Sequence, residues 1–524
     1  MRDFHLPGRS EVLACNGMVA TSHPLAAKVG VAMLEAGGNA VDAAVAAAVL
    51  LGICEPQMTG IGGDMFALVA RSGQAVRALN ASGRAPGGLS AAEMRARGLS
   101  AVPVQGVEAV TLPGAVDGFC RLADEMGVLG LDRLLAPAIR YAEEGVPVAP
   151  RVAFDWAGDA AALQGAARRF YLRDGRALRV GDVFRAPGQA EVLRRIAREG
   201  RAGFYEGEVA ADMVASLRAL GGCHTAEDFA AVRCDWDKPV TGSFGGLEVL
   251  EHPPNGQGAT AILMLNILKH FDLAGMEPFG ARRAHVEAEA TKLAHDARDR
   301  IIADPDRTAR IGFMLAEETA ARLAGMIDPG RAQAVTEARV GALHRDTVYV
   351  CAVDRDGMAV SLIYSVFWGF GSGLASDRFG INFQNRGAGF VLEEGHPNEA
   401  GGGRRPMHTI IPGMLRDGAG IVGPFGVMGG GYQPTGHARF VSNITTWGMG
   451  WQEAIDGPRS FWRGGKLELE RGYAQAVRAE LAAMGHDVVT PEEPLGGAQA
   501  IAIGRDGVLR GASDPRKDGI ALGY

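Results

Sequence analysis

Several features that mark whole classes of protein are missing from this sequence. The longest apolar run, from Ala40 to Ile53, is too short to cross a bilayer and contains Asp42. The opening segment, MRDFHLPGRSEVLACNGMVA, has no apolar stretch long enough for a signal peptide. No basic patch stands out, and the formal net charge is −7, which argues against nucleic acid as a partner. We therefore expect a cytoplasmic protein that binds neither membrane nor nucleic acid.

Cysteine and histidine are too scattered to suggest a metal site or a disulfide framework. His285 and His295 fall on a predicted helix rich in charge and form no HExxH pattern. The segment GFGSGLAS is a near miss to a dinucleotide-binding loop but lacks the strand and helix that such a loop joins. We expect no metal and no cofactor. The six cysteines are expected to be reduced and mostly buried; they stand at positions 15, 54, 120, 223, 234 and 351.

What the chain does contain is material for a large core. Of its 524 residues, 47% are hydrophobic and 22% are charged, which is ordinary for a globular protein. Its 75 glycines show no repeat and indicate many tight turns. No linker or internal repeat divides the chain, so one compact domain is expected. The apolar spacing predicts two helices over 24–53, separated by Gly37 and with Asn39 as a cap, helices over 104–147 broken at Pro113, and one long helix over 281–300.

The segment after His344 changes character. TVYVCAVDRDGMAVSLIYSV holds two apolar runs split by Arg-Asp-Gly, a pattern that predicts a β-hairpin whose first strand begins at Thr347. Earlier in the chain, TGIGGDMFALVA predicts a glycine turn leading into a strand. Beyond residue 365 the sequence is dense in glycine, in WGFGSGLAS and GPFGVMGGGYQPTGH. Such clusters often place backbone N–H groups around a ligand.

Thr347 could also serve as a nucleophile. A threonine hydroxyl is weak without a base. If the Asp346–Thr347 bond were cleaved, the new α-amine, with a reference pKa near 8, would supply that base from the same residue. In the precursor, the hydroxyl could attack the carbonyl of Asp346 itself. By local sequence alone, a threonine that opens a strand is more often only a β-branched residue in a sheet.

A set of longer stretches favours the catalytic interpretation of Thr347. In order and over essentially its whole length, the chain resembles the γ-glutamyltransferase family of N-terminal-nucleophile hydrolases. The stretches that carry the resemblance are MVATSHPLAAKVGVAMLEAGGNAVDAAVAAA, GIGGD, HVEAEATKLAHDARDR, DTVYVCAVDRDGMAVSLIYS, FGSG, RRPMHTIIP and VMGGG. The resemblance implies an α+β fold, a four-layer αββα sandwich. It also implies a precursor cleaved between Asp346 and Thr347 into a large subunit, 1–346, and a small subunit, 347–524, that together form one domain.

The same resemblance assigns catalytic roles. Thr347 matches the family's nucleophile, and Ser365 matches the hydroxyl residue that supports it. Gly429 and Gly430 match the glycine pair whose N–H groups form the oxyanion hole, where two fixed donors are worth a few kcal/mol of barrier, on the order of 3 kcal/mol each. Without the resemblance, the two glycines would be read as a simple turn.

The chain departs from the family where substrate is bound. Members that accept glutathione hold its α-amino group with an Asn, a Gln or Glu, and an Asp; here Phe367, Arg386 and Gly389 stand at those places. The family's carboxylate-binding arginine is also displaced: Ser82 holds its position, and Arg84 follows two residues later. A cationic amine would meet the Arg386 guanidinium without the expected carboxylate, which is unfavourable.

The residues that remain favour an anion without an α-amine. Arg84, Arg386, His408 and Thr409 would bind it, and Phe367 would limit the volume. The pattern resembles the oxamate amidohydrolase branch of the family, which releases ammonia from a short amido acid. Each residue also has a structural interpretation: the arginines as surface or structural groups, His408 and Phe367 as parts of the core.

Three hypotheses therefore stay open. The first is an amidohydrolase acting on a small acid amide such as oxamate. The second is a γ-glutamyl hydrolase or transferase acting on glutathione. The third is a binding protein that keeps the fold and is never cleaved. The partners expected are the small-molecule amide and the two subunits of its own precursor, with no nucleic acid and no membrane.

Overall fold

Two antiparallel sheets form the centre of the computed structural model, which describes residue 5 and residues 8–333 and 347–524. Each sheet has seven strands. The first has the order β1 (Val12–Ala14), β18 (Leu509–Ser513), β17 (Gly497–Ile503), β13 (Gly420–Met428), β12 (Gly413–Asp417), β9 (Leu247–Glu251) and β8 (Val240–Phe244). The second has the order β19 (Ile520–Gly523), β2 (Met18–Thr21), β10 (Val348–Val353), β11 (Ala359–Ser365), β3 (Asp64–Ala70), β4 (Arg77–Ala81) and β7 (Asp235–Asp237).

The two sheets pack face to face on apolar side chains. Phe66, Tyr349 and Ile363 from the second sheet join Met414 and Met428 from the first in one buried cluster. Alternate residues of these strands point into this layer, because side chains alternate across a strand. Both sheets combine strands from before and after residue 347, so neither segment completes either sheet alone.

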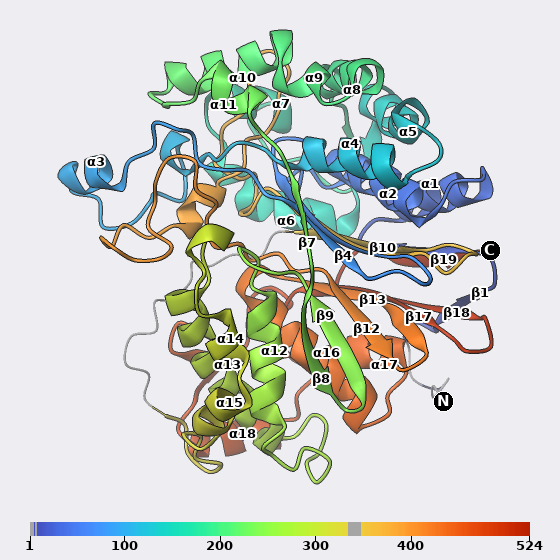
Figure 1. The fold of residues 1–524 in the computed structure, drawn as a ribbon, viewed down its shortest axis with the longest axis vertical. Helices are drawn as coiled ribbons and strands as arrows, with labels where there is room; N and C mark the ends of the chain where they lie inside the picture. The colour runs from blue at the N-terminus through green and yellow to red at the C-terminus, as the bar shows by residue number, and fades with distance from the viewer. Residues whose placement is uncertain (1–4, 6–7, 334–346) are drawn as a thin grey trace.

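Helices cover the outer faces of both sheets (Figure 1). In that view the helices above the sheets are α1 (Pro24–Glu35), α2 (Ala40–Cys54), α3 (Ala91–Ala96), α4 (Ala115–Met126), α5 (Leu131–Glu144), α6 (Pro150–Asp159), α7 (Gly165–Tyr171), α8 (Pro187–Glu199), α9 (Ala202–Tyr205), α10 (Gly207–Ala219) and α11 (Ala226–Ala230). Those below are α12 (Gly258–Leu268), α13 (Ala281–Ile301), α14 (Ile311–Leu315), α15 (Glu317–Ala324), α16 (Gln433–Thr446), α17 (Trp451–Asp456) and α18 (Gln475–Ala483).

Several predictions of local structure are confirmed. Helices α1 and α2 occupy 24–53 and extend one residue further, and Asn39 caps α2 through its side chain. Helix α13 matches the predicted 281–300 helix. Strands β10 and β11 form the predicted antiparallel hairpin, and the glycine turn leads into β3. The mixed helix-and-sheet composition is confirmed as well.

Two details differ from the predictions. Thr347 precedes β10 and is not its first residue. The helical part of 104–147 is shorter than predicted: apart from one short 3-10 turn, Val107–Ala109, it begins only at Ala115. A Cβ on Gly114 would lie 2.4 Å from the carbonyl oxygen of Ala81, so the chain just before α4 packs tightly against β4. None of the described helices is both long and apolar enough to span a bilayer.

Candidate active site

Thr347 lies fully buried at the open end of the β10–β11 hairpin. The hairpin register pairs Val348 with Tyr364, which brings the next residue of β11, Ser365, beside Thr347. The Thr347 hydroxyl donates to the Ser365 Oγ at 3.4 Å. The predicted partner in the cleavage site, Asp346, lies outside the described residues. The structure thus brings the predicted nucleophile and its supporting hydroxyl together.

Arg386 completes this polar group from the 3-10 turn Arg386–Gly389. One guanidinium nitrogen, Nη1, donates to the Thr409 Oγ1 at 2.9 Å, and Nη2 donates to the Ser365 Oγ at 3.3 Å. The guanidinium carbon lies 4.0 Å from the centre of the Phe367 ring. The side chain is completely buried, and its Nε has no hydrogen-bond partner among the described residues. A buried cation with spare donor capacity is suited to an anionic ligand.

Asp64 is the counter-charge that sequence reasoning missed. Its carboxylate, at the start of β3, accepts hydrogen bonds from the N–H groups of Gly83 at 2.8 Å and Gly114 at 3.1 Å, and from the Gln384 Nε2 at 2.8 Å. Burial raises the pKa of Asp64 to about 6, and the Arg386 charge opposes this shift. Burial likewise lowers the pKa of Arg386 to about 9, against the pull of Asp64. The GIGGD motif contains Asp64, but only the fold shows what it faces.

His408 stands behind this group. Its Nε2 lies 3.2 Å from Asp64 Oδ2, and its ring packs at 4.7 Å from that of Phe66. Burial, helped by the charge of Arg386, holds the pKa of His408 well below its ordinary value, so the imidazole is neutral and donates to Asp64. His408 therefore contacts Asp64, whereas its neighbour Thr409 lines a cavity.

The glycine pair lies at the end of β13. Gly429 and Gly430 have φ values of 120° and 56°, in the left-handed region that favours glycine. The side-chain amide of Gln257 ties this loop to the site: its Nε2 donates to the carbonyl of Gly430 at 2.9 Å and to that of Thr409 at 2.6 Å. Arg298 on α13 donates to the Gln257 Oε1 at 3.0 Å. Gln257, also missed from the sequence, thus holds the predicted oxyanion loop beside Thr409.

Arg84 is the one predicted substrate-binding residue that the structure does not bring to this group. Its Nη1 donates to the carbonyl of Gly403 at 3.0 Å and lies 3.4 Å from Asp304. The side chain is 40% exposed. The N–H of the preceding residue, Gly83, donates to Asp64, and the carbonyl of Leu112 lies close to the Gly83 Cα. Arg84 itself contacts Asp304 and Gly403 and not the group around Arg386.

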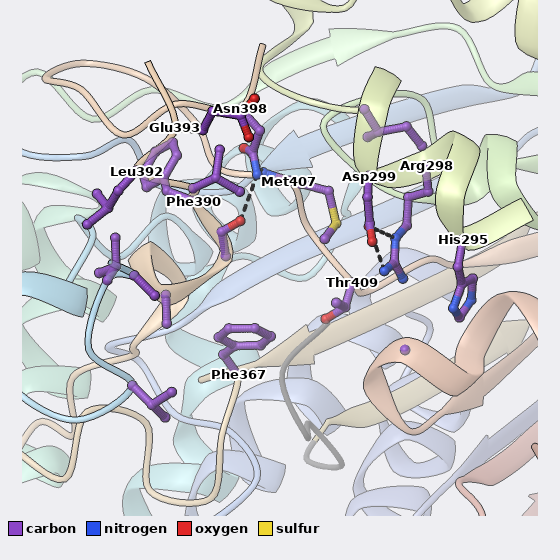
Figure 2. Close-up of a pocket in the computed structure, with 18 of the residues that line it drawn as sticks. His295, Arg298, Asp299, Phe367, Phe390, Leu392, Glu393, Asn398, Met407 and Thr409 are labelled. Atoms are coloured by element: carbon purple, nitrogen blue, oxygen red, sulfur yellow. Dashed lines mark hydrogen bonds and ion pairs between the residues drawn. The ribbon is translucent and has the colours of Figure 1, made fainter. Parts of the chain in front are cut away.

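A cavity of about 680 Å³ opens beside the group (Figure 2). Phe367 and Thr409 line it, together with Gly431 of the glycine loop. Figure 2 shows His295, Arg298 and Asp299 on one side and Phe390, Leu392, Glu393 and Asn398 on the other. The described residues that line the cavity do not include Arg386, whose guanidinium is stacked on the Phe367 ring.

One further group, among the residues that the structure places, has the chemistry of a metal site. Ligand-type atoms of His285, Glu289 and His486 lie within 4.8 Å of one another. The two imidazoles are hydrogen-bonded to each other at 2.8 Å, and Glu289 holds the ammonium of Lys292 at 2.6 Å. These contacts account for the group as a buried hydrogen-bond network, and we assign no metal to it.

Comparison with known proteins extends over nearly the whole chain. The sequence model of the gamma-glutamyltranspeptidase family matches residues 26–524. A glutathione hydrolase-like proenzyme, YwrD of Bacillus subtilis, is 36% identical, with 98% of this chain and 99% of that protein covered. An oxamate amidohydrolase proenzyme of Klebsiella pneumoniae subsp. pneumoniae is 35% identical, with 98% of this chain and 100% of that protein covered.

The fold is shared as widely as the sequence. The crystal structure of a cephalosporin acylase from Bacillus halodurans superposes with a TM-score of 0.93, at 37% identity, and the match covers 100% of this chain and 99% of that one. The three proteins thus carry three different activity names on similar sequences. Evidence for the acyl group that this chain accepts therefore has to come from the residues of its own site.

Proposed function

The chain belongs to the gamma-glutamyltranspeptidase family, and from that premise we propose that it is a precursor which cleaves itself before Thr347 and then acts as an N-terminal-threonine amidohydrolase. The single observation that carries the proposal is the contact of Thr347 with Ser365 and, through it, with Arg386. The proenzyme names of the two relatives support processing. An N-terminal threonine requires no other base, since its own amine serves.

We assign the layered arrangement of helices and sheets to the four-layer αββα sandwich of N-terminal-nucleophile hydrolases. Its two chains would be a large subunit, 1–346, and a small subunit, 347–524. Both sheets combine strands from the two segments, so the subunits would remain together after cleavage as one domain. The active site would also need both: Asp64 and Gln257 come from the first, and Thr347 and Arg386 from the second.

The proposed reaction is acyl transfer to Thr347 followed by hydrolysis. The Thr347 hydroxyl gives its proton to the Thr347 amine and attacks the amide carbonyl. The N–H groups of Gly429 and Gly430 stabilise the oxyanion. The C–N bond breaks, the amine proton passes to the leaving nitrogen, and water then cleaves the ester to release the acid. Ser365, which accepts a hydrogen bond from Thr347, would orient the hydroxyl.

The proposed substrate is an amide of a small carboxylic acid such as oxamate. The carboxylate would be held by Arg386 and Thr409, and Phe367 would keep the acyl side short because its ring packs on the guanidinium. His408 would act indirectly, through Asp64. Arg84 has no part in the proposal, because its contacts are with Asp304 and Gly403.

Glutathione is the second candidate substrate, favoured by the name of the YwrD relative. The charge of Arg386 opposes it, since a γ-glutamyl group carries an α-ammonium ion. Assays of oxamate and of a γ-glutamyl anilide on the same preparation separate the two. We expect ammonia release from oxamate with little cleavage of the anilide. Cleavage of the anilide without turnover of oxamate would make glutathione the first candidate substrate. An inactive protein whose chain remains intact would instead support an uncleaved binding protein.

A further inference from the structure

The cavity beside the site is large for an enzyme that releases only ammonia. Its volume of about 680 Å³ falls within the range of roughly 300–1,000 Å³ that encloses drug-sized ligands. Ammonia contributes a single heavy atom on the leaving side of the amide. If the acyl group is as short as the proposed function requires, neither half of oxamate occupies this space.

The position of the cavity shows which half of a substrate it would receive. Arg386 lies behind Phe367 and does not line the cavity, whereas Phe367 does. Phe367 has a φ of 86°, which is uncommon for a bulky side chain, and its N–H donates to the Ser365 Oγ at 2.9 Å. The Phe367 ring and the Thr409 hydroxyl therefore connect the Arg386 guanidinium to the cavity, because both contact Arg386 and both line the cavity. An acyl carboxylate on Arg386 would direct the leaving nitrogen past Thr409 and Gly431 into the cavity.

The walls of the cavity are mainly apolar. On one side, Val102, Phe390 and Leu392 belong to a single buried cluster. Across the cavity lie Ile302, Phe461 and Trp462, which are also buried. Surfaces of this kind bind apolar groups by removing them from water.

The three arginines in these walls, Arg95, Arg298 and Arg463, are paired with carboxylates of the protein. Arg298 is bonded to Asp299 at 2.7 Å, and Arg95 to Glu399 at 2.9 Å. Arg463 is paired with Glu468. Each of these guanidinium groups is thus hydrogen-bonded to a carboxylate, whereas Arg386 has the nearby charge of Asp64 and an Nε without a hydrogen-bond partner among the described residues. The cavity is therefore matched to an uncharged, apolar group and not to a second anion.

We propose that this cavity binds the apolar body of the amine half of the substrate, an aromatic or branched alkyl amine, so that the natural substrates are N-substituted amides. The inference rests on the proposed function and deepens it. In the reaction the amide C–N bond breaks, the leaving nitrogen takes its proton from the Thr347 amine, and the acyl group forms the Thr347 ester that water hydrolyses. The departing amine remains in the cavity until it diffuses out.

A series of amides with one acyl group tests this. Oxamate and its N-methyl, N-isobutyl and N-benzyl derivatives are compared by kcat/KM; methylamine and isobutylamine are of similar basicity, so that pair isolates binding, whereas benzylamine is the weaker base. We expect kcat/KM to rise along the series, with N-benzyl at least about tenfold above N-methyl, since each well-packed methylene is worth about tenfold or more. A primary amide cleaved as well as or better than the N-benzyl amide would overturn the proposal.

The variant Leu392→Asp locates the effect. It should lower kcat/KM for the N-benzyl amide at least about tenfold and change that for oxamate much less. Phe461→Leu on the opposite wall gives a milder version in case Leu392→Asp does not fold. Val180→Asp is the control, because Val180 is 61% exposed and does not line the cavity. Equal losses for both substrates would contradict the assignment.

Failure of the proposed function is a separate outcome. If the precursor stays intact and hydrolyses no amide, the proposed function fails, and calorimetric binding of N-benzyl oxamate to the intact protein still tests the cavity. Binding that is present in the wild type and lost in Leu392→Asp would support the assignment. Binding that is equal in both proteins, or absent from both, would overturn it.

Discussion

Arg386 beside Thr409 and Arg439 in helix α16 are both withdrawn almost completely from solvent, but their partners differ. Arg439 is paired with Glu287, and its Nη2 donates to the carbonyl of Pro458 and to the Tyr473 hydroxyl. Glu287 also binds Arg283 from α13, at 2.7 Å. Arg386 instead donates to two hydroxyl groups and keeps an Nε without a hydrogen-bond partner among the residues described.

We interpret this difference as the one between a structural arginine, Arg439, and the proposed ligand-binding arginine, Arg386. Burying a charge is tolerated when a carboxylate and further hydrogen bonds compensate it, as Glu287 does for Arg283 and Arg439. A buried N–H donor without a hydrogen-bond acceptor destabilises the folded protein unless a ligand supplies the acceptor. The unused Nε of Arg386 therefore supports the proposal that this residue binds an anion, and the pairs of Glu287 with Arg283 and Arg439 hold helices α13 and α16 together.

The test with the largest expected effect removes one hydroxyl near Arg386, that of Thr347, and one near Glu287, that of Thr291. Thr347→Ala should abolish cleavage and lower amidase activity to below about a thousandth, because nucleophile and base are lost together. Thr291→Ala, which removes a hydroxyl bonded to the carbonyl of Glu287, is the matched control and should process normally. Denaturing gels and steady-state rates measure both. A Thr347→Ala chain that still splits at this bond would refute self-processing.

Replacing Arg386 or Arg439 by methionine should affect different properties: the first mainly catalysis and the second mainly stability. Arg386→Met should lower kcat/KM about a hundredfold through loss of anion binding and should cost less stability than Arg439→Met, since Asp64 keeps its hydrogen bonds from Gly83, Gly114 and Gln384. Arg439→Met should cost about 3–5 kcal/mol of stability, because Glu287 loses one of two cations. Kinetics and thermal unfolding on both variants supply the comparison. Loss of stability without loss of activity in Arg386→Met would make Arg386 structural.

Gln257 links the two regions, because it joins Arg298 on α13 to the glycine loop. Gln257→Glu removes the donor to the carbonyls of Gly430 and Thr409 while keeping the size of the side chain. We expect kcat to fall about tenfold with KM little changed, as is usual for residues that position others. Asn266→Ala, whose amide contacts Leu315 on the outer helices, is the control. A change in KM alone would assign Gln257 to substrate binding instead.

The smallest effect that we expect is the pH dependence of KM, which depends on the protonation of Asp64. The pKa of Asp64 is raised to about 6, so Asp64 becomes neutral below that pH and stops competing with the substrate for Arg386. KM for an anionic amide should fall a few-fold, about 1 kcal/mol or less, between pH 7 and pH 5. Asp64→Asn should show a low KM throughout. A KM that rises on acidification would contradict this role for Asp64.

Stability provides the matching measurement. A carboxyl whose pKa is raised on folding stabilises below its unfolded pKa and loses that contribution as pH rises through the folded value, so Asp64 favours greater stability at pH 5 than at pH 7. For Glu287, burial is outweighed by Arg283 and Arg439, which lower its pKa. Its contribution is therefore present above its ordinary pKa and is lost only in more acidic solution. Thermal unfolding of Asp64→Asn should lack the rise between pH 7 and pH 5.

The helices and strands that could be predicted are those whose stabilising contacts join residues close together in the sequence. Asn39 caps α2 with its own side chain, and the β10–β11 hairpin follows from alternating apolar residues around a turn. The interpretation of Thr347, Ser365 and the glycine pair depended on motifs that match a family. Those motifs name residues but do not give the contacts between them.

The rest depended on contacts between distant segments. Asp64 meets His408 across 344 positions, and Gln257 meets Gly430 across 173, and no local pattern encodes such pairs. Arg84 was expected at the site because it lies near the family's arginine position, but Asp304 holds its side chain elsewhere. The large cavity is formed by segments as far apart as Val102 and Phe461, so it was not visible in the sequence.

Intact mass and amino-terminal sequencing of the purified protein test self-cleavage before Thr347 most directly. We expect two chains that add up to the 54.9 kDa precursor plus one water, with the lighter chain opening Thr-Val-Tyr-Val. An active protein that remains a single chain, or a lighter chain that opens at any other residue, would contradict an N-terminal threonine as the nucleophile.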